Sequence, residues 1–152
     1  MFGRVSKEKV IANVRSALDS LSLKFDEQED GNIVLGAMGD DNPIGMVIVT
    51  DDDHKTLNIY CYLMFDIPED ARAKLIPELN TVNNTINNGG FYMADGEPKI
   101  YFKIVQSYYD RVPSTQMIAH LLTVAFKTVD INDGRLKDLI PASAFRKDPM
   151  FS

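Results

Sequence analysis

The sequence contains few of the residues from which metal sites and reactive centres are built. It has one cysteine, Cys61, and two histidines, His54 and His120. A single cysteine cannot form an internal disulfide or a CxxC metal-binding motif, and two histidines are too few for a histidine-rich zinc site. The motifs GxGxxG, GxxxxGK[ST], GxSxG and HExxH are also absent. The sequence therefore predicts no cofactor and no enzyme active site.

The chain also lacks an excess of positive charge and any long apolar segment. Its 16 Lys and Arg against 22 Asp and Glu give a formal net charge of -6, which argues against nucleic acid or an anionic membrane surface as a partner. It has no apolar run of the roughly eighteen residues that span a membrane, and the first residues, MFGRVSKEKV, contain no signal-peptide core. We therefore expect a cytoplasmic protein that binds proteins or small molecules.

What remains is the composition of an ordinary globular domain, with 45% hydrophobic and 25% charged residues. A domain of about 150 residues buries roughly two-thirds of its unfolded surface, so one core suffices. No repeat or low-complexity tract is visible. We predict a single domain over residues 1–141, followed by a C-terminal tail over 142–152.

The segment Thr56–Phe65, TLNIYCYLMF, is predicted to form the central strand. It has no Gly, Pro or charge, and it is rich in aromatic and β-branched residues. Because strand side chains alternate, one face is predicted to join the core and consists of Leu57, Ile59, Cys61, Leu63 and Phe65. The other face is amphipathic and aromatic, and consists of Asn58, Tyr60, Tyr62 and Met64.

Before this strand the pattern predicts one helix and three further strands. Ser6 is the expected N-cap of an amphipathic helix whose apolar residues are Val10, Val14, Ala17, Leu18 and Leu21. Strands are expected over 23–28, 32–38 and 45–50, with a tight turn at Asp30–Gly31 that requires a positive φ. Four consecutive antiparallel strands after one helix indicate an α+β fold.

After the central strand the pattern predicts a helix, two strands and a final helix. The second helix begins at Pro68–Asp70 and continues to Ile86, with a kink or a division into two helices caused by Pro77. The residues 87–90, NNGG, are the expected C-cap. Strands are expected over 91–94 and 99–106, and the last helix is expected to begin at Pro113–Ser114 and to end or break at Asp133–Gly134.

The candidate interaction residues are the aromatic residues and the methionine on the second face of the sheet. They come together if their strands are neighbours, and they are Tyr60, Tyr62, Met64, Tyr92 and Tyr101. Tyrosine and methionine are enriched at protein interfaces, because a phenol ring contributes apolar area while its hydroxyl stays hydrated. The alternative is a core on both sides of the sheet, with the last helix covering these rings.

A second hypothesis is an enzyme or small-ligand sensor with a pocket between sheet and helices. It is based on the run Asp51–His54 and on the asparagines at positions 80, 83, 84, 87 and 88. Consecutive residues in a hairpin point away from one another, and the run lacks the spacing of a calcium-binding loop. We therefore interpret Asp51–His54 as a solvated turn and predict no metal site there.

The segment 65–102 resembles the bacterial YbjN-type sensory-transduction regulator family. The similar features are Ile67–Glu69, the pairs Leu79–Asn80 and Val82–Asn83, the step Gly90–Phe91 and the turn Asp95–Gly96. The order of elements is similar to the type III secretion chaperone-like fold. That resemblance implies helices packed on a curved antiparallel sheet, a non-enzymatic protein-binding or regulatory role linked to stress responses, a homodimer, and no catalytic residue.

Overall fold

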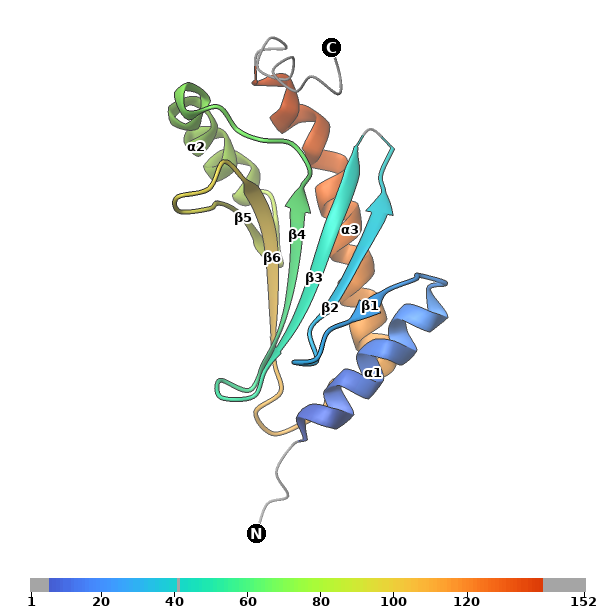
Figure 1. Ribbon diagram of the computed structural model, residues 1–152. Helices are drawn as coiled ribbons and strands as arrows, with labels where there is room; N and C mark the ends of the chain where they lie inside the picture. Colours follow the sequence, from blue (N-terminus) through green and yellow to red (C-terminus); the bar gives the residue numbers. More distant parts are fainter. Residues whose placement is uncertain (1–5, 41, 141–152) are drawn as a thin grey trace.

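The computed structural model describes residues 6–40 and 42–140, which form three helices and six strands (Figure 1). In chain order the elements are α1 Lys7–Ser20, β1 Asp26–Glu27, β2 Ile33–Met38, β3 Pro43–Asp51, β4 Thr56–Leu63, α2 Glu69–Asn83, β5 Gly90–Met93, β6 Ile100–Ser107 and α3 Thr115–Asp138. This order confirms the predicted α+β fold. None of the described helices is long and apolar enough to cross a membrane.

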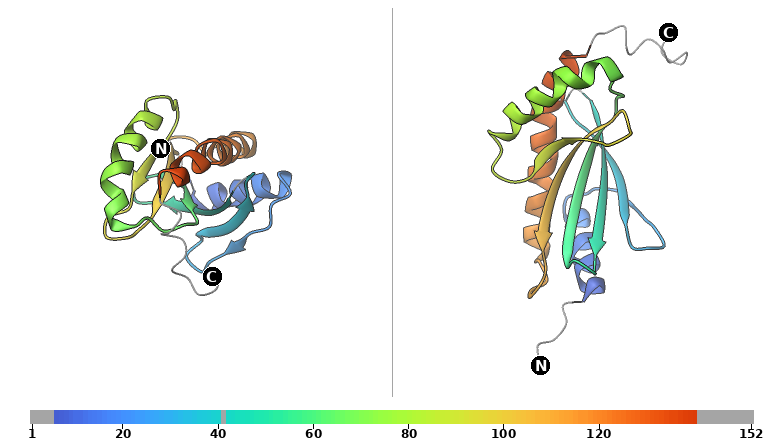
Figure 2. Two further views of the ribbon diagram at one scale, coloured as in Figure 1. Left: turned by 90° about the horizontal axis from the view of Figure 1, so that it is seen from above. Right: turned by 90° about the vertical axis from the view of Figure 1, so that its left-hand side faces the viewer.

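The six strands form one antiparallel sheet in the order β1-β2-β3-β4-β6-β5. Strand β4 lies inside the sheet, between β3 and β6. In Figure 1 the sheet lies in front of α3, and Figure 2 shows α1 and α3 on the same side of it. Helix α2 packs beside β5 at one end. The opposite face of the sheet carries no described helix.

The core lies between the sheet and the helices, as the alternation of β4 predicts. Leu57, Ile59 and Cys61 are fully buried on this face. The apolar sides of the helices complete the core, with Val14 from α1 and Leu122 from α3 among the buried residues. Burying a side chain of this size contributes about 1.5–3 kcal/mol to folding. Because the core on the helix side supplies this stability, the other face of the sheet does not have to be apolar.

Local signals determine several of the element ends. The Ser6 hydroxyl caps α1 by accepting a hydrogen bond from the Lys9 amide at 3.4 Å. Ser114 caps α3 in the same way, with the Met117 amide at 3.0 Å. Gly31 has a φ of 88°, as the predicted turn requires.

Two predicted strands are longer than the observed ones. The strand expected over 23–28 is reduced to Asp26–Glu27, because the chain leaving α1 diverges from β2 before residue 26. The central strand ends at Leu63 instead of Phe65.

The predicted division of α2 at Pro77 is wrong, because α2 is assigned as one helix from Glu69 to Asn83. Proline removes the hydrogen bond to the carbonyl of Ala73, but Ala73 is exposed, so water can satisfy that carbonyl. Buried Leu75 and Leu79 hold the helix on both sides of the proline.

The predicted ends of the two longer helices are also wrong. Helix α2 ends at Asn83, and its C-cap Asn84 has right-handed backbone angles, so residues 87–90 are not the cap. Helix α3 passes through Asp133–Gly134 to Asp138, because Val129, Asp133 and Leu136 are buried on one side of it. The predicted tail over 142–152 lies outside the described residues.

Candidate protein-interaction face

Cross-strand pairing brings four tyrosines together on the face of the sheet that carries no described helix. Tyr62 of β4 is paired with Tyr101 of β6, and Tyr101 is paired with Tyr92 of β5. Tyr60 lies two residues from Tyr62 on β4, where it is paired with Lys103. We call Tyr60, Tyr62, Tyr92 and Tyr101 the tyrosine cluster.

The four rings are in contact, and Tyr101 is the centre of the cluster. Its ring centroid lies 6.0 Å from that of Tyr60, 5.9 Å from that of Tyr62 and 5.5 Å from that of Tyr92. The rings of Tyr60 and Tyr62 are 6.3 Å apart and stacked. Aromatic pairs at such distances stabilise one another by about 0.5–1.5 kcal/mol beyond their burial, so the rings hold their orientations before any partner arrives.

The tyrosine cluster remains accessible to a partner. Tyr92 is 48% exposed and Met64 is 56% exposed, while the other three rings are half-buried against one another. The alternative in which the last helix covers these rings is wrong, because α3 packs on the opposite face of the sheet, where its buried residues join Ile59 and Cys61 in the core.

The environment of the cluster favours the neutral form of the Tyr62 phenol. Burial, followed by the neighbouring Tyr60 and Tyr101 hydroxyls, raises the pKa of Tyr62. Lys103 places a cation beside the cluster, with its Nζ 5.3 Å from the Tyr60 ring centroid. The surface therefore offers apolar ring area, hydroxyl groups and a positive charge, which suits binding of a protein surface.

Two glycines continue the tyrosine row toward β2. Gly45 is paired with Tyr62, and Gly36 is paired with Gly45. A Cβ on Gly45 would lie 2.9 Å from Met64 Sδ, so Met64 covers Gly45, whereas nothing lies within 4 Å of a Cβ on Gly36. The two glycines therefore leave a shallow depression in this face of the sheet beside the rings. Met64 lies between the rings and the bare backbone at Gly36. Sequence reasoning missed these glycines and Lys103, because cross-strand partners are not visible in the alternation of a single strand.

Two carboxylates of the acidic turn Asp51–His54 have partners within the protein, and Tyr108 also donates to Asp52 at 3.1 Å. Asp51 Oδ2 lies 2.8 Å from His54 Nδ1, and Asp52 Oδ1 forms an ion pair with Lys55 Nζ at 2.7 Å. These hydrogen bonds lower the pKa of both carboxyl groups. The described residues contain no group of three or more His, Cys, Asp or Glu arranged to hold a metal ion.

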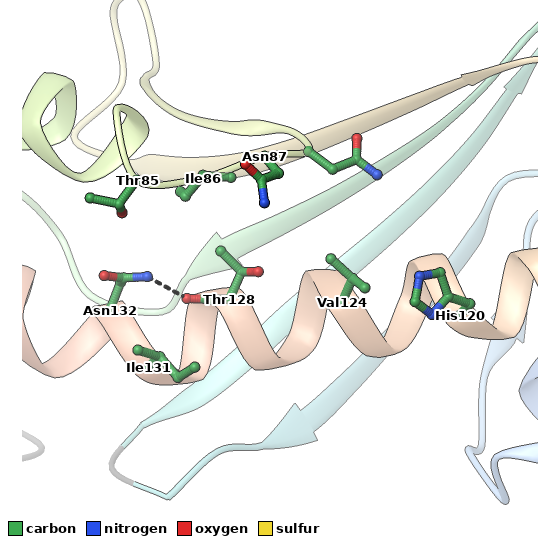
Figure 3. Close-up of a pocket in the computed structure, with 9 residues that line it drawn as sticks. Thr85, Ile86, Asn87, His120, Val124, Thr128, Ile131 and Asn132 are labelled. Carbon is green, nitrogen blue, oxygen red and sulfur yellow. Dashed lines mark hydrogen bonds between the residues drawn. The ribbon is translucent and has the colours of Figure 1, made fainter.

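A cleft lies between α3 and the connection from α2 to β5 (Figure 3). It has a volume of about 520 Å³, and its walls include Asn87, Asn88, His120 and Asn132. The Asn132 amide donates to the Thr128 carbonyl at 2.8 Å within α3. Among the described residues its lining has one imidazole and no carboxylate or thiol.

Of the three other asparagines of the second hypothesis, Asn80 and Asn84 are exposed, and Asn83 has a structural role. The side-chain amide of Asn83 accepts a hydrogen bond from the Phe91 amide at 2.8 Å and donates one to the Phe91 carbonyl at 3.0 Å. It thus pairs with the outer edge of β5 as a neighbouring strand would.

Comparison with solved structures identifies similar folds. The crystal structure of YbjN from E. coli has a TM-score of 0.62 and 17% identity, and the match covers 88% of this chain and 96% of that one. A structure of the ExsC-ExsE complex has a TM-score of 0.56 and 12% identity, with 90% of this chain and 97% of that one covered. At these identities the likeness shows the fold, and it confirms the expected resemblance to type III secretion chaperones.

Sequence comparison gives the family. No curated protein matches the chain. The family model of YbjN, described as "Putative bacterial sensory transduction regulator", matches residues 11–131, which is most of the chain. The chain therefore belongs to the YbjN family.

Proposed function

We propose that this chain is a non-enzymatic regulatory domain of the cytoplasm that acts as a homodimer and binds a protein partner through the tyrosine cluster. The proposal rests on the set of four contacting rings on a sheet face that none of the described helices covers. Met64 extends the same surface, since it is 56% exposed and lies over Gly45.

A rigid aromatic surface loses little side-chain conformational entropy when a partner binds. A tyrosine has two side-chain torsions, and the contacts within the cluster already restrict them, so a partner would gain apolar contact at a small entropic cost. The hydroxyl groups and Lys103 can form hydrogen bonds at the same surface. Interfaces are enriched in residues of this kind.

The comparisons support the same class of function. The family description is that of a regulator, and the ExsC-ExsE complex, which has a similar fold, is a complex of two proteins. Neither comparison identifies a partner for this chain.

The test is capture of partners from extracts of the native cells by three forms of the full chain. These are the wild type, Tyr62→Asp in the cluster, and Ile131→Asp, a matched control at a residue of α3 that is 78% exposed. We expect a protein that the wild type and Ile131→Asp capture and that Tyr62→Asp does not, with at least a tenfold loss of affinity for the purified pair. Equal capture by all three forms would show that the cluster is not the contact.

A further inference from the structure

The outer edge of β2 is open along four of its six residues. Strand β1 pairs only with Ile33 and Val34, so Leu35–Met38 has no strand partner on its outer side among the described residues. The strand reads IVLGAM and contains no charged residue. Natural proteins commonly protect such an edge with charges, proline or a bulge, because its main-chain groups otherwise pair with another strand.

The main-chain groups that point outward from this edge belong to Gly36 and Met38. The β2–β3 hairpin is closed by the Gly39 amide, which donates to the Asn42 carbonyl at 2.9 Å. Antiparallel ladders alternate, so Leu35 and Ala37 form the next hydrogen-bonded pairs with β3. Gly36 and Met38 then direct their N–H and C=O groups away from the sheet.

The opposite edge of the sheet, at β5, is covered, so the two edges differ in their ability to pair with another strand. At β5 the Asn83 side chain binds both the N–H and the C=O of Phe91, and α2 packs beside that strand. The edge of β2 has no such device among the described residues. It is bordered instead by an apolar groove of about 340 Å³ on the helix side, whose lining includes Leu23, Leu35 and Phe126.

We propose that the open edge of β2 pairs with β2 of a second copy of this chain, antiparallel, with a two-fold axis at Ala37. This register places Ala37 opposite Ala37, and Gly36 of each copy opposite Met38 of the other. Four main-chain hydrogen bonds then form, two at each Gly36–Met38 pair.

The side chains are complementary in this register. Met38 is 72% exposed, and the space beside Gly36 is empty, so each Met38 lies over the bare backbone at Gly36 of the second copy. Two small Ala37 side chains meet at the axis, where facing Cα atoms approach to about 4.5 Å. The second strand also covers the apolar groove beside Leu35.

The resulting sheet joins two six-stranded halves, and its two-fold axis is perpendicular to the sheet. Both tyrosine clusters therefore lie on the same side of the dimer. The strand pair is about 17 Å long and buries on the order of 500 Å² in total, which is below the roughly 1,200 Å² of stable interfaces. The dimer is accordingly reversible and depends on concentration. This inference gives a contact to the homodimer of the proposed function and is independent of which protein the cluster binds.

The first experiment is sedimentation equilibrium of the full chain over about 5 to 500 μM. The average mass of the wild type should rise with concentration from that of a monomer toward that of a dimer. Gly36→Pro should remain a monomer. Proline removes the outward N–H of residue 36 and leaves the main-chain hydrogen bonds between β2 and β3 intact. Gly36→Ala is the matched control: it keeps the outward N–H and should still dimerise, although its methyl group displaces the flexible Met38 side chain of the second copy. A wild type that stays monomeric throughout, or a Gly36→Pro variant that still dimerises, would overturn the proposal.

The second experiment tests the register by oxidative cross-linking. Ala37→Cys should form a disulfide-linked dimer, because facing residues of a non-hydrogen-bonded pair lie within disulfide distance. Val34→Cys, on the same strand but away from the axis, should not. Equal cross-linking of both variants, or none at Ala37→Cys, would contradict the register.

The two proposals can fail separately. If Tyr62→Asp lowers the average mass in sedimentation and Gly36→Pro does not, the dimer contact lies at the tyrosine cluster and not at β2. Loss of partner capture without a change in mass concerns only the proposed function.

Discussion

Replacement of Asn83 by alanine tests how the fold closes one edge of its sheet. In the native chain the Asn83 amide accepts a hydrogen bond from the Phe91 N–H at 2.8 Å and donates to its C=O at 3.0 Å, both at partly buried positions. The methyl group of alanine can do neither. The outward main-chain groups of Phe91 would then depend on whatever water reaches that edge.

The expected cost follows from these two hydrogen bonds. Each contributes about 0.5–1.5 kcal/mol net, and a group left without a partner costs more, so we expect a loss of about 2 kcal/mol in the free energy of unfolding. For a domain of about 150 residues this lowers Tm by roughly 4–8 °C. The amide hydrogen of Phe91 should also exchange faster with solvent.

The assay is urea unfolding followed by circular dichroism, with Asn80→Ala as the matched control. Asn80 lies one turn earlier on α2 and is exposed, so its replacement should leave stability unchanged or slightly higher. A loss below about 0.5 kcal/mol for Asn83→Ala, equal to that of the control, would refute the idea that this amide closes the sheet.

Three further predictions concern the core, the acidic turn and the cysteine. Ile59→Ala should cost about 2–5 kcal/mol in urea unfolding, whereas Met64→Ala on the exposed face should cost less than about 0.5 kcal/mol; similar costs would contradict the assignment of faces. The Lys55 ammonium lowers the pKa of Asp52 below 3.8, so its stabilising effect is present above that pH and lost as pH falls through the lowered pKa. The difference in Tm between wild type and Asp52→Asn should therefore be largest near neutral pH and vanish in acid, and a constant difference would be evidence against the ion pair. Burial raises the pKa of Cys61 to about 12, so iodoacetamide should label it only on unfolding, and rapid labelling of the native chain would disprove its burial.

Alternation along single strands predicted the two faces of β4, and capping residues predicted where α1 and α3 begin. These signals are local, since Ser6 and Ser114 bind amides three residues away. The same alternation placed Tyr60 and Tyr62 on one face. It could not show that Tyr101 lies beside them, because β6 follows β4 only after α2 and β5, and its place in the sheet is a long-range property.

The wrong predictions have the same origin in contacts distant in sequence. Helix α2 ends at Asn83, where the Asn83 side chain pairs with a strand that begins seven residues later. Helix α3 continues through Gly134 because Val129 and Leu136 are buried on one side of it, and that packing outweighs the helix-breaking tendency of glycine. The open edge at Gly36 is likewise defined by where β1 stops pairing.

If the tyrosine cluster is the binding surface, its side chains become covered when a partner binds. Hydroxyl-radical footprinting of the captured complex, read residue by residue by mass spectrometry, measures this without any mutation. Tyr92, which is 48% exposed in the free chain, and Met64 should lose most of their oxidation in the complex, while Tyr109, which is 81% exposed and outside the cluster, should keep its own. Unchanged oxidation of Tyr92 and Met64, with protection elsewhere on the chain, would contradict the central claim.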